Sequence, residues 1–321
     1  MKNFEYLKAH TVHEATAYLA RYGKAASVIA GGTDLITVMK EGVKAPDYII
    51  DLKTVPGLAY VKEGNGELRI GALTLLRDIE DSSLVKTKYQ GLAQAAHLVA
   101  SHQIRNIGTI GGNLCQEVEC WYYRKPQFTC YRKDGDQCFA FDGEDKFGAI
   151  FVMPGTEKCW AAFPSDLAPM LVAMGAKLKL VGPAGDRLVP VEEFYGELGH
   201  NLGPAEILVE VQVPRPLPGL KSTYVKFRLA KGVGFAVSSA AAAIVVEDGR
   251  CAQVRIALGG VAPVPWRARK AEEVLQAKVI DEKVAEEAAD AVIKESKPLK
   301  KTVYKEPITR ALIKRAILAS L

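Results

Sequence analysis

The sequence predicts an α+β protein of two domains, and three observations lead to this prediction. The chain has 321 residues, enough for two domains of about 150 residues each. Hydrophobic residues make up 49% and charged residues 25%, as in an ordinary globular protein, which excludes a disordered chain, a collagen and a coiled coil. Three prolines fall within residues 214–218 and interrupt helix and sheet alike. We therefore expect a first domain over 1–216 and a smaller α+β domain over 217–321.

The first domain opens with alternating short strands and helices. A strand is expected at residues 4–7, and a helix begins at Thr11, because Thr11 and Glu14 have the spacing of a capping box. Short apolar runs at 26–30 and 48–52 indicate buried strands. The first of these runs ends at a pair of glycines, so a strand leads directly into a tight loop.

A second glycine loop follows the next strand and helix. Residues 68–73 predict a strand, and residues 83–101 predict a helix with apolar residues three or four positions apart. This helix leads into the loop 108–113. Its glycine pair, Gly111 and Gly112, lies 80 residues after the first pair, Gly31 and Gly32.

A cysteine-rich segment, residues 115–160, comes next and has neither helical nor strand periodicity. Five of the six cysteines of the chain lie in it. A long irregular loop inside a compact domain needs something other than an apolar core to organise it, and a bound metal cluster can do so. The sequence therefore predicts an irregular insertion that binds metal.

The second domain has the pattern of a sheet covered by helices. Alternating and apolar segments at 223–229, 239–246 and 254–258 predict antiparallel strands. The stretches that follow Arg267 and Pro307 predict helices packed on this sheet.

Composition also excludes several classes of function. The net charge of +5 is spread along the chain, which gives nucleic-acid binding little support. No apolar run is long enough to span a membrane, and the first residues lack the apolar stretch of a signal peptide, so we expect a cytoplasmic protein. Neither the P-loop nor the Rossmann fingerprint is present. No Ser-His-Asp or Cys-His order indicates nucleophilic catalysis, so no residue is assigned a catalytic role.

The two glycine loops have chemistry suited to a diphosphate. Glycine leaves the backbone amides unshielded, so successive N–H groups can point at one anion. Two such loops, if they meet in the fold, could bind the two phosphates of a dinucleotide. Polar contacts could come from Thr33, Asp34, Thr109 and Asn113.

The cysteine spacings leave three kinds of site open. Successive cysteines of the segment are five, ten, eight and 21 positions apart, whereas zinc sites usually contain closely paired cysteines. Disulfides need an oxidising compartment, which nothing in the sequence indicates. An iron–sulfur cluster, a zinc site and metal-free thiols therefore remain open.

The phrases at residues 29–35 and 103–113 together resemble the FAD-binding medium subunit of molybdenum hydroxylases, the family of xanthine dehydrogenase, carbon monoxide dehydrogenase and aldehyde oxidase. The resemblance continues at 165–169, 206–208 and 224–228 and implies a two-part FAD-binding domain. The FAD contacts that it implies are Ile29, Ala30, Gly31, Gly32, Thr33, Asp34, Leu35, Thr109, Ile110, Gly111, Gly112, Asn113, Asp166, Leu208 and Lys226. From the residues alone, Asp166 could instead cap a helix and Lys226 could be an exposed strand lysine.

The cysteine-rich segment is similar to 4-hydroxybenzoyl-CoA reductase, whose flavin subunit carries an additional [4Fe-4S] cluster after its second glycine loop. This similarity implies a cluster held by Cys120, Cys130, Cys138 and Cys159. Cys115 is left out of the ligand set because it belongs to the phrase of the second glycine loop.

The resemblance implies an electron-transferring FAD subunit of a molybdenum-containing oxidoreductase complex, itself without the substrate chemistry. In the reductase reading, ferredoxin donates electrons that pass through [4Fe-4S] and FAD towards the 2Fe-2S clusters of a small subunit and the molybdenum cofactor of a large subunit, in a dimer of heterotrimers. One alternative is the flavin subunit of a hydroxylase of the xanthine, aldehyde or carbon monoxide type. Another is a non-redox scaffold with a structural zinc loop.

Overall fold

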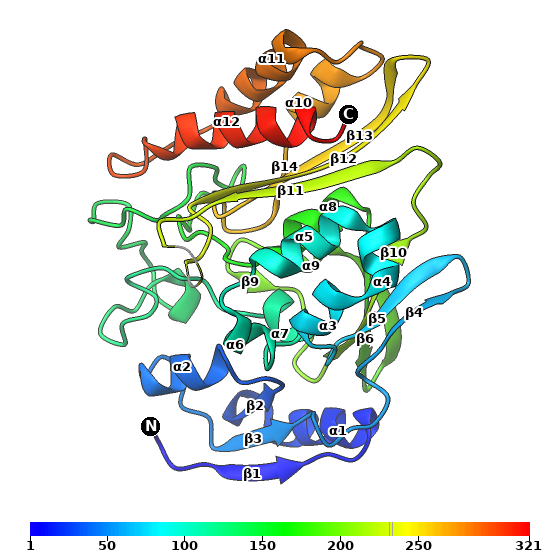
Figure 1. The fold of residues 1–321 in the computed structure, drawn as a ribbon. Coiled ribbons are helices and arrows are strands. Elements are labelled where there is room, and N and C mark those ends of the chain that lie inside the picture. The colour runs from blue at the N-terminus through cyan, green and yellow to red at the C-terminus, as the bar shows by residue number, and fades with distance from the viewer. Residues whose placement is uncertain (231, 233) are drawn as a thin grey trace.

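The protein, a computed structural model that describes residues 1–230, 232 and 234–321, is built around four sheets (Figure 1). The first sheet has the order β1-β3-β2, and its strands are parallel. Its elements are β1 (Glu5–Lys8), α1 (Val12–Tyr22), a 3-10 turn (Gly23–Ala25), β2 (Ala26–Ile29), α2 (Leu35–Lys40) and β3 (Tyr48–Asp51). Helix α1 begins where the sequence predicts, because the Thr11 hydroxyl accepts a hydrogen bond from the Glu14 amide at 3.0 Å. The Glu14 carboxylate accepts from the His10 amide, one residue before the cap.

The second sheet is antiparallel, with five strands in the order β4-β5-β10-β6-β7. Its strands are β4 (Val61–Gly64), β5 (Glu67–Gly71), β6 (Lys177–Gly182), β7 (Gly185–Pro190) and β10 (Ile207–Pro214). Its accompanying helices are α3 (Leu76–Asp81), α4 (Ser83–Lys88), α5 (Gln90–Leu98), α6 (His102–Arg105), α7 (Ile110–Leu114), α8 (Leu167–Ala173) and α9 (Val191–Phe194). A two-stranded ribbon, β8 (Tyr195–Gly196) with β9 (Gly199–His200), lies beside them.

The prediction of a single helix over 83–101 was wrong, because the structure has two helices there. The backbone leaves the helical region at Tyr89, whose φ and ψ are −132° and 48°, so the stretch forms α4 and α5. Tyr89 is almost completely buried in the main core. The helix is thus interrupted at a buried aromatic residue, which the apolar periodicity of the sequence did not indicate.

The cysteine-rich segment connects α7 to α8 and contains one regular element, a 3-10 turn at Tyr131–Lys133. It is attached to the last sheet at several points. The amides of Ile150 and Phe151 both donate to the Val261 carbonyl, at 2.8 and 2.9 Å. The ring of Phe151 stacks on Trp266 with 5.1 Å between centroids.

The last sheet is antiparallel, as predicted, and is buried on both faces. It contains β11 (Lys221–Phe227), β12 (Ser238–Glu247), β13 (Arg250–Gly259) and β14 (Trp266–Arg267), followed by α10 (Arg269–Leu275), α11 (Glu282–Ile293) and α12 (Lys305–Leu318). Ala240 and Ala242 of β12 pack with these three helices, whereas Ala241 and Ala243 pack with the first domain. Helices α10, α11 and α12 therefore cover one face of this sheet, and the first domain covers the other (Figure 1). Within the described residues, no helix combines the length and apolar character needed to cross a membrane.

Candidate cofactor-binding site

The two glycine loops meet, although they are 80 residues apart in the sequence. Gly31 lies two residues after the end of β2, and a Cβ atom placed on it would lie 2.2 Å from the carbonyl oxygen of Ile107. Gly32 has a φ of +74°, which disfavours residues with a side chain. Only glycine at position 31 therefore allows the two loop backbones to touch.

The second loop is fixed against the end of β5. The Gly111 amide donates to the Ala72 carbonyl at 2.9 Å, and the Ile110 amide donates to the Thr74 carbonyl at 3.0 Å. The Thr109 hydroxyl accepts from the Gly112 amide at 3.0 Å and so caps α7. The loop is consequently held in one conformation by the sheet behind it.

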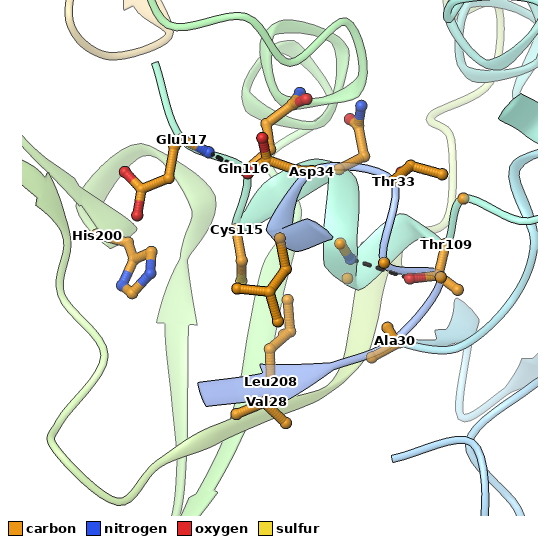
Figure 2. Close-up of a pocket in the computed structure, with 18 of the residues that line it drawn as sticks. Val28, Ala30, Thr33, Asp34, Thr109, Cys115, Gln116, Glu117, His200 and Leu208 are labelled. Carbon is orange, nitrogen blue, oxygen red and sulfur yellow. Dashed lines mark hydrogen bonds between the residues drawn. The ribbon is translucent and has the colours of Figure 1, made fainter. Parts of the chain in front are cut away.

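A cavity of about 660 Å³ opens in front of these loops, a volume typical of cofactor sites. Thirteen of the 15 predicted FAD contacts line it (Figure 2): Ala30, Gly31, Gly32, Thr33, Asp34, Leu35, Thr109, Gly111, Gly112, Asn113, Asp166, Leu208 and Lys226. The other two lie behind the wall. Ile110 is fully buried in the main core, and the Ile29 side chain lies next to Gly32.

Asp166 and Lys226 form an ion pair of 2.6 Å at the cavity wall. Their side chains are only 3% and 1% exposed. Asp166 also accepts from the Tyr224 hydroxyl at 2.6 Å, whereas the cap of α8 comes from Ser165, whose Oγ accepts from the Ala168 amide. Burial raises the pKa of Asp166, and the charge of Lys226 opposes this shift. Asp166 therefore stands at the N-cap position of α8 without capping the helix through its side chain, and Lys226 is not an exposed strand lysine.

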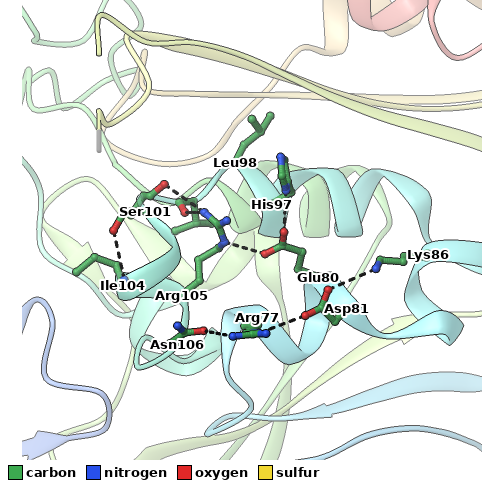
Figure 3. Close-up of polar contacts among 12 residues, drawn as sticks. Arg77, Glu80, Asp81, Lys86, His97, Leu98, Ser101, Ile104, Arg105 and Asn106 are labelled. Carbon is green, nitrogen blue, oxygen red and sulfur yellow. Dashed lines mark hydrogen bonds and ion pairs between the residues drawn. The ribbon is translucent and has the colours of Figure 1, made fainter. Parts of the chain in front are cut away.

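Another part of the wall is shaped by a buried arginine that the sequence analysis did not identify (Figure 3). Arg105 donates to Glu80 at 2.7 Å, and it also donates to the carbonyls of Val99 and Ala100 at 2.9 and 3.3 Å. Val99 and Ala100 line the cavity. Arg105 therefore fixes the turn between α5 and α6 that forms this side of the site.

The opposite part of the wall contains polar residues that sequence reasoning also missed. Cys115, Gln116, Glu117 and His200 line the cavity together (Figure 2). Burial raises the pKa of the Cys115 thiol to about 12 and lowers the pKa of His200. Cys115 is thus a neutral thiol facing the cavity. No spacing in the sequence connects His200 with this loop.

The Asp34 carboxylate is bound by the cysteine-rich segment. One oxygen accepts from the Glu117 amide at 2.8 Å, and the other accepts from Nη2 of Arg124 at 2.9 Å. Both carboxylate oxygens of Asp34 are therefore already occupied by the cysteine-rich segment. The expected polar contact between this side chain and a diphosphate would have to compete with these bonds.

Four cysteines of the segment lie in two apolar clusters. Cys120, Cys130 and Cys159 share one cluster, and Cys138 lies in another with Trp160. Nε of Arg132 donates to the Cys159 sulfur at 3.2 Å. All six cysteines of the chain are free thiols. Within residues 1–230, 232 and 234–321, no three His, Cys, Asp or Glu side chains converge on a site for a single metal ion.

Comparison with known proteins agrees with this site. Residues 2–216 match the FAD-binding domain in molybdopterin dehydrogenase, and residues 223–320 match the CO dehydrogenase flavoprotein C-terminal domain. The FAD-binding subunit of an aldehyde oxidoreductase from Escherichia coli (strain K12) is 35% identical over 284 residues, which cover 86% of each chain. The carbon monoxide dehydrogenase medium chain of Hydrogenophaga pseudoflava is 28% identical over 322 residues, covering 99% of this chain and 96% of the relative.

A solved structure of carbon monoxide dehydrogenase from Hydrogenophaga pseudoflava, which lacks the Mo-pyranopterin moiety of its molybdenum cofactor, superimposes with a TM-score of 0.81 at 29% identity. The match covers 99% of this chain and 97% of that chain. Quinoline 2-oxidoreductase from Pseudomonas putida 86 superimposes with a TM-score of 0.78 at 25% identity, over 100% of this chain and 98% of the other. Because the family models match nearly the whole chain and the relatives align along most of it, this chain belongs to the family of FAD-binding subunits of molybdenum-containing oxidoreductases.

Proposed function

We propose that this chain binds FAD in the cavity between its glycine loops and transfers electrons within a molybdenum-containing dehydrogenase of the aldehyde, carbon monoxide or xanthine type. One observation carries the proposal. The backbone of Gly31 touches that of Ile107, so two loops distant in sequence form one wall of a 660 Å³ cavity. The names of the relatives, an aldehyde oxidoreductase and carbon monoxide dehydrogenases among them, favour this type over the reductase reading.

The residues present fit a bound diphosphate. Among the described residues, the amides of Gly32, Thr33, Asp34 and Leu35 in the first loop have no hydrogen-bond partner, so they can point at an anion. The amides of Ile110, Gly111 and Gly112 in the second loop are already bound to Thr74, Ala72 and Thr109. Lys44 also lines the cavity and adds positive charge, although it is paired with Glu117. The donors available to the phosphates are therefore backbone amides of the first loop, supported by one nearby cation.

Lys226 is placed to donate to the cofactor. Its ammonium group has three N–H donors, of which the described residues take two, through Asp166 at 2.6 Å and the Leu98 carbonyl at 3.1 Å. Because Lys226 lines the cavity, we assign the remaining donor to the cofactor. When bound, FAD supplies the one- and two-electron chemistry, whereas the chain supplies binding, orientation and exclusion of water.

The proposed complex contains this chain, a large molybdenum-cofactor subunit and a small subunit with 2Fe-2S clusters, assembled as a dimer of heterotrimers in the cytoplasm. Support comes from relatives that are named as medium chains and FAD-binding subunits. Substrate chemistry is assigned to the large subunit. We also propose the domain boundary at 216/217, next to the gap between the two family matches.

A second proposal concerns the cysteine-rich segment. We propose that it binds a [4Fe-4S] cluster through Cys120, Cys130, Cys138 and Cys159. Support comes from the placement of three of these residues in one buried cluster, with the fourth in the neighbouring cluster. The four thiolates of such a cluster bind four different iron atoms, so they need not converge on a single ion. If the segment binds such a cluster, a complex of the 4-hydroxybenzoyl-CoA reductase type is favoured. Ferredoxin would then be the electron donor.

Cofactor analysis of the purified complex tests the FAD proposal. We expect one FAD per chain in the wild type and strong loss of FAD in Gly31→Ala, because the new Cβ would collide with the Ile107 carbonyl. Gly64→Ala is the matched control, since its Cβ would meet only the Arg69 side chain, at 3.8 Å. A wild-type complex without flavin, or equal FAD content in both variants, would contradict the proposal.

The same preparation tests the cluster. We expect about four irons per chain, in addition to those of the small subunit, and no stoichiometric zinc. Cys130→Ser should lose this iron, whereas Cys251→Ser should keep it, because Cys251 is buried in the last domain. Zinc in place of iron would support the scaffold alternative.

A further inference from the structure

The cysteine-rich segment is joined to the first glycine loop by one buried arginine, Arg124, which is 7% exposed. Its Nη2 atom donates to Asp34 at 2.9 Å, and its Nε atom donates to the Val118 carbonyl at 3.0 Å. The second Asp34 oxygen accepts from the Glu117 amide at 2.8 Å (Figure 2). Asp34, Arg124 and Glu117 therefore connect the loop to the segment through both carboxylate oxygens.

We propose that Arg124 is a positioning residue for FAD. Through Asp34 it fixes the first glycine loop, so that the folded cysteine-rich segment and the bound cofactor stabilise each other. This inference rests on the proposed FAD site.

Arg124 holds helix α2 at both ends. Asp34 directly precedes the helix, and Glu41 directly follows it. The guanidinium lies 2.9 Å from Asp34 and 3.5 Å from Glu41, and Glu119 of the segment completes the group at 2.6 Å. One cation thus pairs with three carboxylates around a helix of six residues. Without Arg124 these like charges would repel one another, and the helix would lose the contact that ties both its ends to the segment.

Arg124 affects the cavity through the first glycine loop, whose backbone leads directly into α2. Gly32, Thr33, Asp34 and Leu35 all line the cavity, so movement of the Asp34 carboxylate moves the loop that faces the phosphates. No contact between Arg124 and the cofactor is required. The arginine acts on FAD through Asp34.

Residues 146–149 of the segment are bound to the last domain, which holds the segment in position. Nζ of Lys305, on α12, donates to the Phe147 carbonyl at 2.7 Å and to the Gly260 carbonyl at 2.8 Å. The Thr302 hydroxyl and the Tyr304 hydroxyl bind the carbonyls of Ala149 and Lys146. Arg124 therefore extends from a segment that the last domain holds in place.

The first test measures FAD affinity by flavin fluorescence on the deflavinated full chain. Arg124→Gln should raise the Kd for FAD about 5- to 150-fold, the usual range of coupling between two sites. Arg124→Lys, which keeps the charge, should recover part of this loss. Lys133→Gln is the matched control, because Lys133 lies in the same segment but donates to the carbonyls of Tyr122 and Lys125 rather than to the loop or to a proposed cluster ligand. An unchanged Kd in Arg124→Gln, or equal losses in both glutamine variants, would overturn the inference.

The second test uses reciprocity, since two coupled sites must affect each other by the same factor. FAD should slow tryptic cleavage within residues 125–146 of the wild type, and should protect Arg124→Gln much less. Asp34→Asn should weaken FAD binding less in the Arg124→Gln background than alone, because both changes remove the same contact. Additive effects, or equal protection of wild type and variant, would overturn the inference. A wild type that binds no FAD would instead refute the proposed function.

Discussion

Lys226 and Asp166 form a buried ion pair of 2.6 Å that joins β11 of the last sheet to the start of α8. The two residues are 60 positions apart. Because both side chains are almost fully removed from water, each depends on the other for charge compensation. The wall of the cavity is therefore stable only when the two parts of the chain are docked together.

Lys226→Met should destabilise the chain by about 3–5 kcal/mol, because it leaves a buried carboxylate without its cation. Urea unfolding measures this loss. The double variant Lys226→Met/Asp166→Asn should regain much of the stability but not the FAD affinity, since the free donor of Lys226 is absent from both variants. Recovery of FAD binding in the double variant would contradict a direct role for Lys226.

Lys305 should make stability dependent on pH in alkaline solution. Burial lowers the pKa of Lys305 to about 7 from an ordinary value of 10.5, and the charge of Asp145 opposes this shift. Between these two values the folded chain binds fewer protons than the unfolded chain, so stability rises with pH. This contribution is complete above pH 10.5 and is lost as the pH falls to about 7.

Lys305→Met cannot titrate at this position and serves as the reference. Relative to this variant, the free energy of unfolding of the wild type should rise with pH above neutrality, with a slope that approaches ~1.4 kcal/mol per pH unit. Urea unfolding across the weakly alkaline range, below the titration of the tyrosines, measures this slope. Parallel pH profiles for the two proteins would show that Lys305 has an ordinary pKa.

Arg105→Met should destabilise the chain by about 3 kcal/mol or more, because Glu80 loses its buried partner. FAD affinity should fall as well, since the carbonyls of Val99 and Ala100 at the cavity wall lose their donor. The control is Arg77→Met on α3. The exposed side chain of Arg77 also donates to Asn106 at 3.1 Å (Figure 3). Arg77 forms an exposed pair with Asp81, which contributes only about 0.3–0.5 kcal/mol. Equal losses in the two variants would contradict the role of Arg105.

Cys115→Ser should leave the iron content unchanged, because Cys115 lines the cavity rather than lying in the apolar clusters of the other four cysteines. In the wild type, Cys115 should react slowly with iodoacetamide at neutral pH, since a pKa near 12 leaves little thiolate. Iron analysis and mass spectrometry of the alkylated chain measure the two effects. Loss of iron in Cys115→Ser would place this residue in the ligand set.

Local patterns predicted much of the fold. The Thr11 cap, the position of both glycine loops and the antiparallel last sheet could be predicted, because each depends on residues close in sequence or on regular alternation. The break at Tyr89 could not, because a turn at a large apolar residue carries no local signal. The partners of Arg105 and Arg124 were missed for a related reason. An arginine in a sequence gives no sign of being buried, and its burial depends on carboxylates and carbonyls that other segments supply.

By itself, the sequence determined which backbone could approach a diphosphate, since the absence of side chains at Gly31, Gly32, Gly111 and Gly112 is a property of the residues alone. Only the tertiary structure decided that the two loops share one cavity, that Lys226 is buried with Asp166, and that Asp34 binds the cysteine-rich segment. Each of these contacts joins residues at least 60 positions apart in the sequence, and Asp166 with Lys226 has the smallest separation. Such contacts form only when packing of the sheets and helices brings those segments together and excludes water from the charges between them.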